Sequence, residues 1–302
     1  MTSAERERES NTIEFCPICN SSKNIKLKKY DKDHLTKCKK CSFVYSLKIP
    51  SKLELDSVYN NYNYDDNITS IGDINKKTSI AKLLFSQKNI AFVLDVGCGA
   101  GVWLDILKEN KCKTYGTEYN DKQKSIALSK GHKILKGGLF PIVDDGVKFD
   151  LIIFTEVIEH IQNPIEALLY LNSLLAKDGL IYITTPNFSA IERYVLKDDW
   201  GIISYPEHLT YFTPKTLNHA LVKSNFSKIK IYTENISIFR IIEAYNKNSR
   251  RQSKLPSDKI SEKIQSITNQ KITLKIVKKI INFVLNIFGV GVSIVCIYQK
   301  KN

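Results

Sequence analysis

Short apolar runs alternate with helical patterns through the middle of the chain. Two of these runs end at Asp95 and at Glu118, and the other three span residues 134–135, 149–154 and 180–184. Each is the length of a strand, and the stretches between them carry leucines at helical spacing and stop at a glycine. An alternation of strand and helix predicts a parallel sheet that is covered on both faces by helices.

The segment around the first run is the most informative. Residues 91–101 read AFVLDVGCGAG, and Glu118 comes seventeen residues after the last of these glycines. In a doubly wound sheet, ligands bind at the carboxyl ends of the strands, where glycines let the backbone approach closely. An acidic residue about 20 positions further on accepts hydrogen bonds from ribose hydroxyls. The segment therefore predicts a nucleoside-binding site.

The spacing of the loop indicates which nucleoside. The pattern is G-x-G-x-G instead of G-x-G-x-x-G, and Asp95 lies two residues before the first glycine, where it would repel a pyrophosphate. A ligand with a cationic amino-acid end suits this acid better. The stretch resembles the first motif of class I S-adenosylmethionine-dependent methyltransferases. That resemblance implies Asp95 at the amino-acid end of the cofactor, Glu118 at its ribose, and Leu139 and Thr155 beside its adenine. The cofactor contacts expected are Asp95, Gly97, Cys98, Gly99, Glu118, Tyr119, Gly138, Leu139, Thr155 and Glu156.

The same resemblance implies the complete fold, an α/β, Rossmann-like sheet of seven strands. Residues 228–234 are then the sixth strand, and residues 292–299 are the seventh, which is antiparallel. A basic helical insert at about 236–288 separates them. We expect a zinc ribbon in residues 1–50, a linker with a helix in 51–90, and the methyltransferase core in 91–302.

Four cysteines near the N-terminus have the spacing of a structural metal site. Cys16 and Cys19 form one C-x-x-C pair, Cys38 and Cys41 form another, and eighteen residues separate the pairs. Two such knuckles close a tetrahedron of thiolates around Zn²⁺ and leave no open coordination position. We therefore expect a structural zinc ion.

Two further motifs carry candidate catalytic residues. The string EVIEHIQNP begins at Glu156 and is similar to a motif of class I methyltransferases that act on small molecules. Its His160 is either a general base or a residue that only satisfies backbone groups at a helix start. A DPPY-type tetrad, which enzymes that methylate exocyclic nitrogens of bases carry after this strand, does not follow it.

The string EHLTYF, which begins at Glu207, resembles an element of zinc-containing sugar C-methyltransferases. The resemblance implies that Glu207 and His208 remove a proton from the substrate, assisted by tyrosines matching Tyr62 or Tyr64. The alternative is a structural turn around His208. Those enzymes carry a further large domain after the core, which has no counterpart in residues 236–302. Methylation of oxygen, nitrogen or carbon in a sugar, sugar nucleotide or glycan intermediate therefore stays open.

Charge is distributed unevenly along the chain, whose formal net charge is +14. Residues 91–235 hold 16 basic and 17 acidic residues, whereas residues 236–302 hold 13 and three. A protein that grips nucleic acid across its active face would be basic around the cofactor as well, so nucleic acid is not the expected partner. The rival functions are an RNA methyltransferase and a zinc-ribbon binding protein with an inactive core. The oligomeric state is open.

The C-terminal region invites two structural interpretations. Residues 280–299 are uncharged and flanked by lysines, which fits a membrane span by length. Lys275, Lys278, Lys279, Asn282 and Asn286, however, fall on one helical stripe, opposite Leu274, Val277, Ile281, Val284, Leu285 and Phe288. This amphipathic pattern favours a helix whose apolar stripe packs on the core, with contact to an anionic membrane surface as a further hypothesis. The charged N-terminus shows no apolar run, and we expect a cytoplasmic protein, peripheral to the inner membrane where the helix docks.

Overall fold

The computed structural model describes residues 12–61, 70–144, 146–197, 200–236 and 272–301. Its centre is a sheet whose strand order is β10-β11-β8-β7-β4-β5-β6. The strands in that order are β10 (Phe226–Glu234), β11 (Ser293–Lys300), β8 (Leu175–Pro186), β7 (Phe149–Thr155), β4 (Phe92–Val96), β5 (Lys113–Thr117) and β6 (Lys133–Ile134). Strands β4 to β8 pair in parallel, and β11 is antiparallel to both of its neighbours. The predicted seven-stranded, Rossmann-like fold class is confirmed.

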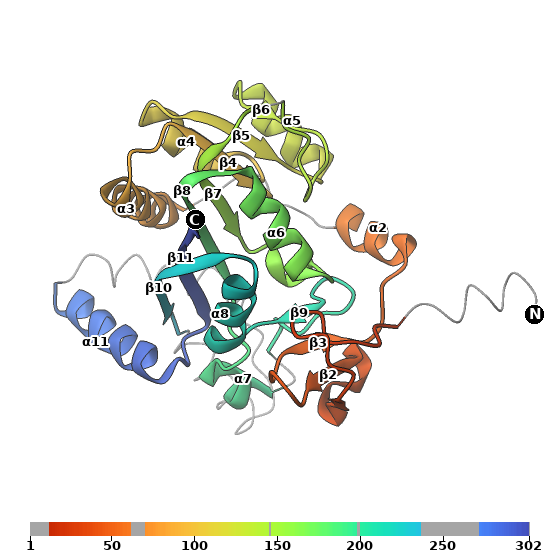
Figure 1. Cartoon of the computed structure of the whole chain (residues 1–302). Helices are drawn as coiled ribbons and strands as arrows, with labels where there is room; N and C mark the ends of the chain where they lie inside the picture. Colours follow the sequence, from red (N-terminus) through yellow and green to blue (C-terminus); the bar gives the residue numbers. More distant parts are fainter. Residues whose placement is uncertain (1–11, 62–69, 145, 198–199, 237–271, 302) are drawn as a thin grey trace, which may run out of the picture.

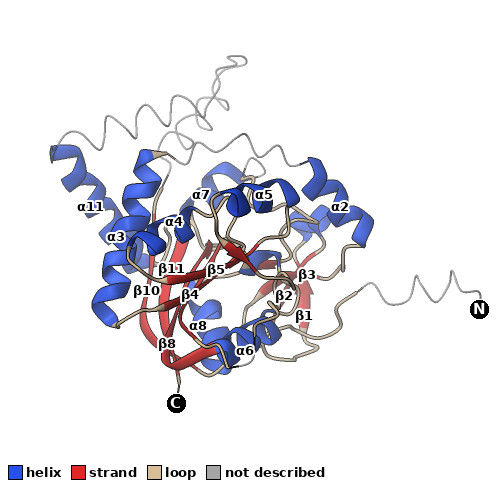
Figure 2. Ribbon diagram, turned by 90° about the horizontal axis from the view of Figure 1, so that it is seen from above, coloured by secondary structure: helices blue, strands red, loops and turns tan. Residues whose placement is uncertain are grey.

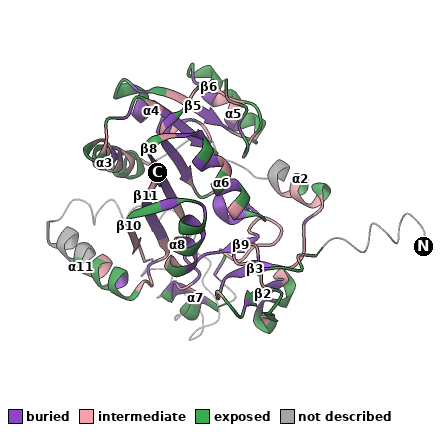
Figure 3. Cartoon of the chain, in the orientation of Figure 1, coloured by how far each residue is buried: buried purple, intermediate pink, exposed green. Residues whose placement is uncertain are grey.

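Helices cover both faces of this sheet (Figure 2). One face packs on α3 (Ile71–Gln87) and α4 (Val102–Glu109), and the other packs on α6 (Pro164–Leu174) and α8 (Pro214–Lys223). The helix α5 (Asp121–Ser129) follows β5. Most side chains of the central strands β4, β7 and β8 are buried, as the purple strands of Figure 3 show. Because strand order reverses between β4 and β7, the carboxyl ends of these two strands flank the position where α/β folds bind ligands.

The cysteine-rich segment forms a second, smaller sheet with the order β1-β2-β3-β9. Its strands are β1 (Asn24–Lys26), β2 (Leu35–Cys38) and β3 (Val44–Ser46), and η1 (Lys28–Asp33) joins the first two. The fourth strand, β9 (Thr210–Tyr211), comes from the EHLTYF element of the core and pairs antiparallel with β3. The rings of Phe43 and Phe212 lie 5.0 Å apart across this junction. The ribbon and the core thus share one continuous apolar cluster.

The C-terminal helix α11 (Ile272–Phe288) contacts the sheet with the stripe opposite to the one expected. Asn286 Oδ1 accepts from the backbone N–H of Thr233 at 3.2 Å, and Asn282 Oδ1 accepts from that of Asn235 at 3.2 Å. Leu285 is buried, but Val284 and Phe288, expected on the core, are exposed. The correction has a physical reason. The outer edge of β10 presents unpaired N–H groups, which asparagines can satisfy and apolar side chains cannot.

Three short helices complete the described chain. They are α2 (Lys52–Asn61), η2 (Ile158–His160) and α7 (Ile191–Leu196). Tyr62 and Tyr64 lie outside the described residues, as does most of the predicted insert. Within the part of the chain that is described, no helix combines the length and the apolar character needed to cross a bilayer.

Candidate active site

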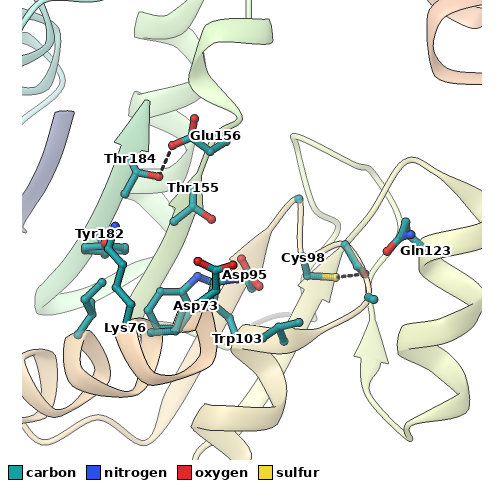
Figure 4. A pocket seen from close by; sticks show the side chains of 16 residues that line it. Asp73, Lys76, Asp95, Cys98, Trp103, Gln123, Thr155, Glu156, Tyr182 and Thr184 are labelled. Atoms are coloured by element: carbon teal, nitrogen blue, oxygen red, sulfur yellow. Dashed lines mark hydrogen bonds between the residues drawn. The ribbon is translucent and has the colours of Figure 1, made fainter. Parts of the chain in front are cut away.

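A cavity of about 550 Å³ opens at the carboxyl ends of β4 and β7 (Figure 4). This volume lies within the range of about 300–1,000 Å³ that is usual for small-molecule sites. The cavity is lined by residues of the glycine loop, of α3 and α4, and of the ends of β7 and β8. They are Asp73, Lys76, Lys77, Ile80, Asp95, Gly97, Cys98, Gly99, Ala100, Val102, Trp103, Gln123, Thr155, Glu156, Tyr182 and Thr184.

The glycine loop turns tightly between β4 and α4. Gly97 has φ +77°, and a Cβ atom there would lie 2.6 Å from Cγ2 of Val157. Gly101 has φ +86°, and its Cβ would lie 2.8 Å from Cδ2 of His132. Both positions exclude larger residues by backbone conformation and by space. The loop can therefore pass close to β7 and line the cavity with backbone.

Asp95 is a buried carboxylate in surroundings that suit a cationic ligand. It is 1% exposed, and neither of its carboxylate oxygens has a hydrogen-bond partner among the described residues. Burial raises the pKa of Asp95 to about 7, although the Lys77 ammonium acts in the opposite direction. An unpaired buried carboxylate is costly unless a ligand satisfies it. The side chain faces the cavity, so an ammonium group bound there would stabilise its ionised form.

The helix α3 contributes a face of the cavity that the sequence interpretation missed. Asp73, Lys76, Lys77 and Ile80 follow one another at helical spacing along this face. Lys76 forms an ion pair with Glu234 at 2.5 Å. Lys77 Nζ lies 5.8 Å from the centre of the Trp103 ring, and burial lowers its pKa. Lys77 and Asp95 together place opposite charges at one end of the cavity, as a zwitterionic amino-acid group requires.

Glu118 supports the glycine loop at the tip of β5. Its Oε2 accepts from the backbone N–H of Gly99 at 2.8 Å, and its Oε1 accepts from that of Asn120 at 2.7 Å. Each carboxylate oxygen has a further lone pair, so both remain able to accept from hydroxyls. Glu118 itself is not among the residues that line the cavity, and neither are Tyr119, Gly138 and Leu139. Leu139 instead packs against the main core.

Thr155 and Glu156 line the cavity at the end of β7. Glu156 has φ +53°, an uncommon conformation for a residue other than glycine. Its Oε1 accepts from the Thr184 hydroxyl at 2.7 Å. Behind it, Glu159 is 3% exposed and accepts from the Thr185 hydroxyl at 2.9 Å. Burial, followed by repulsion from Glu156, raises the pKa of Glu159 well above its usual value, so these two carboxyls favour a state in which Glu159 keeps its proton.

Next to these carboxyls, the structure brings together the two histidines predicted from separate motifs. The rings of His160 and His208 lie 4.8 Å apart in an edge-to-face arrangement. His160 Nδ1 lies 2.9 Å from the carbonyl oxygen of Glu207, and His208 Nδ1 lies 2.6 Å from that of Ile202. Because a carbonyl oxygen can only accept, both Nδ1 atoms carry the proton. In the neutral form each Nε2 then keeps a lone pair that can accept a proton.

The role of Glu207 differs from the expected one. Its carboxylate lies 3.4 Å from the Ser204 hydroxyl, and His208 is oriented by the carbonyl of Ile202 instead. The backbone carbonyl of Glu207 accepts the Nδ1–H of His160. The backbone N–H of Leu209 donates to the carbonyl of Glu159 at 2.8 Å, so the EHLTYF element is fixed directly onto η2.

Two groups of side chains among the described residues could hold a metal ion. In the ribbon, the sulfur atoms of Cys16, Cys19, Cys38 and Cys41 lie within 4.8 Å of one another. Four converging thiols with no other function fit a tetrahedral zinc ion, although only the arrangement of the cysteines supports it. The second group is Glu159, His160 and His208, which offer one oxygen and two nitrogens within the same distance.

The residues of the cavity fit S-adenosylmethionine. Asp95 and Lys77 match the ammonium and carboxylate of its amino-acid end, and the glycine loop leaves room for close approach. Glu118, the acid expected at the ribose, supports this loop through the backbone N–H of Gly99. Trp103 and Tyr182 add aromatic surface, with rings 5.7 Å apart. The cavity thus has the charges and the aromatic surface that a charged nucleoside requires, and it lies beside the two histidines.

Comparison with known proteins gives the same result. A family model described as a methyltransferase domain matches residues 62–231, more than half of the chain. The chain is 27% identical over 145 residues to the ubiquinone biosynthesis O-methyltransferase of Haemophilus ducreyi, a match that covers 44% of this chain and 56% of that protein. It is 30% identical over 169 residues to the corresponding enzyme of Pelagibacter ubique, covering 50% of this chain and 67% of the relative. The first of these matches therefore spans little more than half of the relative.

A solved structure resembles the fold at low sequence identity. It is the complex between the Haloferax volcanii Trm112 methyltransferase activator and a methyltransferase, with 14% identity and a TM-score of 0.50. The match covers 84% of this chain and 98% of that one. At this identity the likeness bears on the fold alone. Together with the family match and the cavity, it leads to one conclusion: the chain belongs to the methyltransferase domain family and is an S-adenosylmethionine-dependent methyltransferase.

Proposed function

We propose that this enzyme methylates a hydroxyl group of a sugar, a sugar nucleotide or a glycan intermediate. The observation that carries the proposal is the pair formed by His160 and His208 next to Glu156, at the edge of the cofactor cavity. The resemblance of the EHLTYF element to sugar-modifying methyltransferases supports a sugar acceptor. The names of the curated relatives, which are O-methyltransferases, support transfer to oxygen.

The histidine pair can perform the proton transfer that such a reaction needs. Bound in the cavity, S-adenosylmethionine would supply a sulfonium methyl group, whose carbon an oxygen nucleophile can attack with S-adenosylhomocysteine as the leaving group. A sugar hydroxyl is a poor nucleophile until its proton is removed, and a neutral imidazole can take that proton on its Nε2. His160 has its Nδ1–H engaged by Glu207 and His208 has its own engaged by Ile202, so the rings are held in one tautomer.

The surroundings of the pair keep the base in its reactive form. Burial, together with the charge of His208 when that ring is protonated, lowers the pKa of His160. His160 therefore stays neutral near pH 7. The Glu156 carboxylate is exposed at the cavity and can accept from a neighbouring substrate hydroxyl. The cluster thus aligns a polyhydroxylated acceptor and removes one proton.

Isotopic labelling tests the acceptor directly. The enzyme is incubated with S-adenosylmethionine carrying a ¹³C methyl group and with sugar nucleotides, a catechol that represents a quinol precursor, and structured RNA. Mass spectrometry finds the labelled product, and ¹³C NMR distinguishes a methoxy group from a methyl group on carbon. We expect a methoxy sugar, with turnover insensitive to salt. Transfer to the catechol or to RNA alone would reject a sugar acceptor, and a methyl on a sugar carbon would reject oxygen.

A further inference from the structure

Two residues that line the cavity hold buried polar atoms without a hydrogen-bond partner among the described residues. They are Asp95, through both carboxylate oxygens, and Trp103, through its indole Nε1–H. Asp95 is 1% exposed and Trp103 is 4% exposed, so neither group is compensated by contact with bulk water. A buried donor or acceptor that stays unpaired is costly. Both groups therefore favour a ligand in the cavity that pairs them.

The two unpaired groups require opposite partners. An ionised carboxylate such as that of Asp95 only accepts hydrogen bonds, whereas the indole of Trp103 only donates. The two side chains do not satisfy each other, since neither has a partner within hydrogen-bond distance. A ligand that pairs both must therefore offer a donor to Asp95 and an acceptor to Trp103. The amino-acid end of S-adenosylmethionine offers this combination, because its ammonium only donates and its carboxylate only accepts.

Trp103 lies next to the lysine that can meet the same carboxylate. It is the second residue of α4, directly after the glycine loop, and α4 packs beside α3 over one face of the sheet (Figure 1). Lys77 of α3 places its Nζ atom 5.8 Å from the centre of the Trp103 ring. Tyr182 holds the ring from the side of the sheet, at a centroid distance of 5.7 Å. A cation and a neutral donor thus belong to neighbouring side chains of the cavity wall.

The second tryptophan of the chain provides an internal comparison. Trp200 is 3% exposed, and its Nε1–H also has no partner among the described residues. It packs with Tyr30 and Tyr211 in the apolar cluster between the ribbon and the core, and it does not line the cavity. An unpaired indole alone is therefore no sign of a ligand. What distinguishes Trp103 is its place in the cavity wall, together with Lys77 and the unpaired Asp95.

From these observations we propose that Trp103 donates its Nε1–H to the carboxylate of the cofactor's amino-acid end, beside the ammonium of Lys77. A site built to hydrogen-bond a group rejects an analogue without that group, because its own buried polar atoms are then left unpaired. Trp103 thus makes the cavity selective for nucleosides that keep the amino-acid carboxylate. The proposal is independent of the acceptor of the methyl group, since binding of S-adenosylhomocysteine requires no turnover.

Calorimetry with three nucleosides tests the proposal on the full chain. S-adenosylhomocysteine carries the ammonium and the carboxylate, its decarboxylated analogue S-adenosyl-3-thiopropylamine carries the ammonium alone, and methylthioadenosine carries neither. The variant Trp103→Phe removes the N–H and keeps an aromatic ring. We expect it to weaken the binding of S-adenosylhomocysteine by about tenfold or more, because a hydrogen bond to a charged group is lost, and to leave the Kd of the other two nucleosides unchanged. Trp200→Phe, the matched control, should bind all three like the wild type.

NMR of the indole N–H groups observes the proposed donor in the unmodified protein. The chain has two tryptophans, so ¹⁵N-tryptophan labelling should give two indole signals, and Trp200→Phe assigns the remaining one to Trp103. We expect S-adenosylhomocysteine to move the Trp103 proton signal downfield and the decarboxylated analogue to leave it in place. The same response to both nucleosides would overturn the proposal. An equal loss of affinity for all three nucleosides in Trp103→Phe would also overturn it, since Trp103 would then only support the shape of the cavity.

Discussion

His160 and His208 lie with their ring centres 4.8 Å apart, and each donates its Nδ1–H to a backbone carbonyl. The two residues come from different parts of the chain, one from η2 after β7 and the other from the element that precedes β9. The backbone N–H of Leu209 and the hydroxyl of Thr210 fix one segment onto the other. The methyltransferase core therefore supplies one histidine, and the strand that completes the ribbon sheet positions the other.

Removing either histidine should slow methyl transfer without weakening cofactor binding. Loss of a general base reduces rates by about 10²–10⁴-fold. We expect His160→Gln and His208→Gln each to lower kcat within this range, because neither residue lines the cofactor cavity. Isothermal titration with S-adenosylhomocysteine should give unchanged Kd values. His219→Gln, on α8, is the matched control and should keep the wild-type kcat. A full rate in both active-site variants would exclude the pair as the base.

The pH profile should report the environment of His160. Burial and the neighbouring His208 lower the pKa of His160 below the usual value of 6.5. A general base acts in its neutral form, so the rate falls only when the pH drops below that lowered pKa. We expect the acid limb of kcat/KM to lie below pH 6.5, and His160→Gln to shift or remove this limb. An acid limb at or above pH 6.5 that persists in His160→Gln would contradict this assignment.

Asp95 should make the stability of the cofactor-free enzyme depend on pH. Its pKa is about 7 in the folded protein and 3.8 in an ordinary aspartate. Between these values the folded state holds a proton that the unfolded chain has released, so stability is greatest at low pH and is lost as the pH rises toward 7. This difference of about three pKa units corresponds to a change of about 4 kcal/mol at most in the free energy of unfolding. In urea unfolding, the wild type should lose stability between pH 4.5 and about 7.5 relative to Asp95→Asn. Parallel curves for the two proteins would refute this.

The sequence revealed the strands and the glycine loop because they depend on local patterns. Asp95 and Gly97 are informative through their spacing alone, and the structure places both at the cavity. The orientation of α11 could not be predicted from its apolar stripe. It depends on the N–H groups of Thr233 and Asn235, which remain unpaired only because β10 is an edge strand. An amphipathic pattern shows that a helix has two faces, but the strand order decides which face meets the sheet.

The contribution of α3 to the cavity could not be predicted from the sequence for a related reason. Its residues Asp73, Lys76, Lys77 and Ile80 have helical spacing, and that spacing alone does not distinguish a face toward solvent from a face toward a ligand. Two lysines and an acid on one side of a helix just before the glycine loop were the available signal. The convergence of His208 with His160 could not be predicted from the sequence either, because it depends on long-range contacts of Leu209 and Thr210 with η2.

Lys77 should contribute to cofactor affinity through its charge. It lines the cavity near Asp95, where it can meet the carboxylate of the amino-acid end. A charge-assisted hydrogen bond contributes about 1.5–3 kcal/mol, so Lys77→Met should weaken S-adenosylhomocysteine binding by about tenfold or more in calorimetry. Lys82→Met, an exposed lysine on the same helix, is the matched control and should bind like the wild type. Equal affinities for the two variants would remove Lys77 from the site.

Metal removal should act on His208 through the strand pairing of the ribbon. The four cysteines converge, and β3 between them and the core pairs with β9 through Val44 and Tyr211. We expect one zinc ion per chain by plasma mass spectrometry, lost in Cys38→Ser but kept in Cys112→Ser, whose thiol lies outside the ribbon. Without the metal, hydrogen exchange should accelerate around residues 208–212 and kcat should fall, whereas cofactor affinity should persist because the ribbon contributes no residue to the cavity. Unchanged exchange in Cys38→Ser would show that β9 holds its place without the metal.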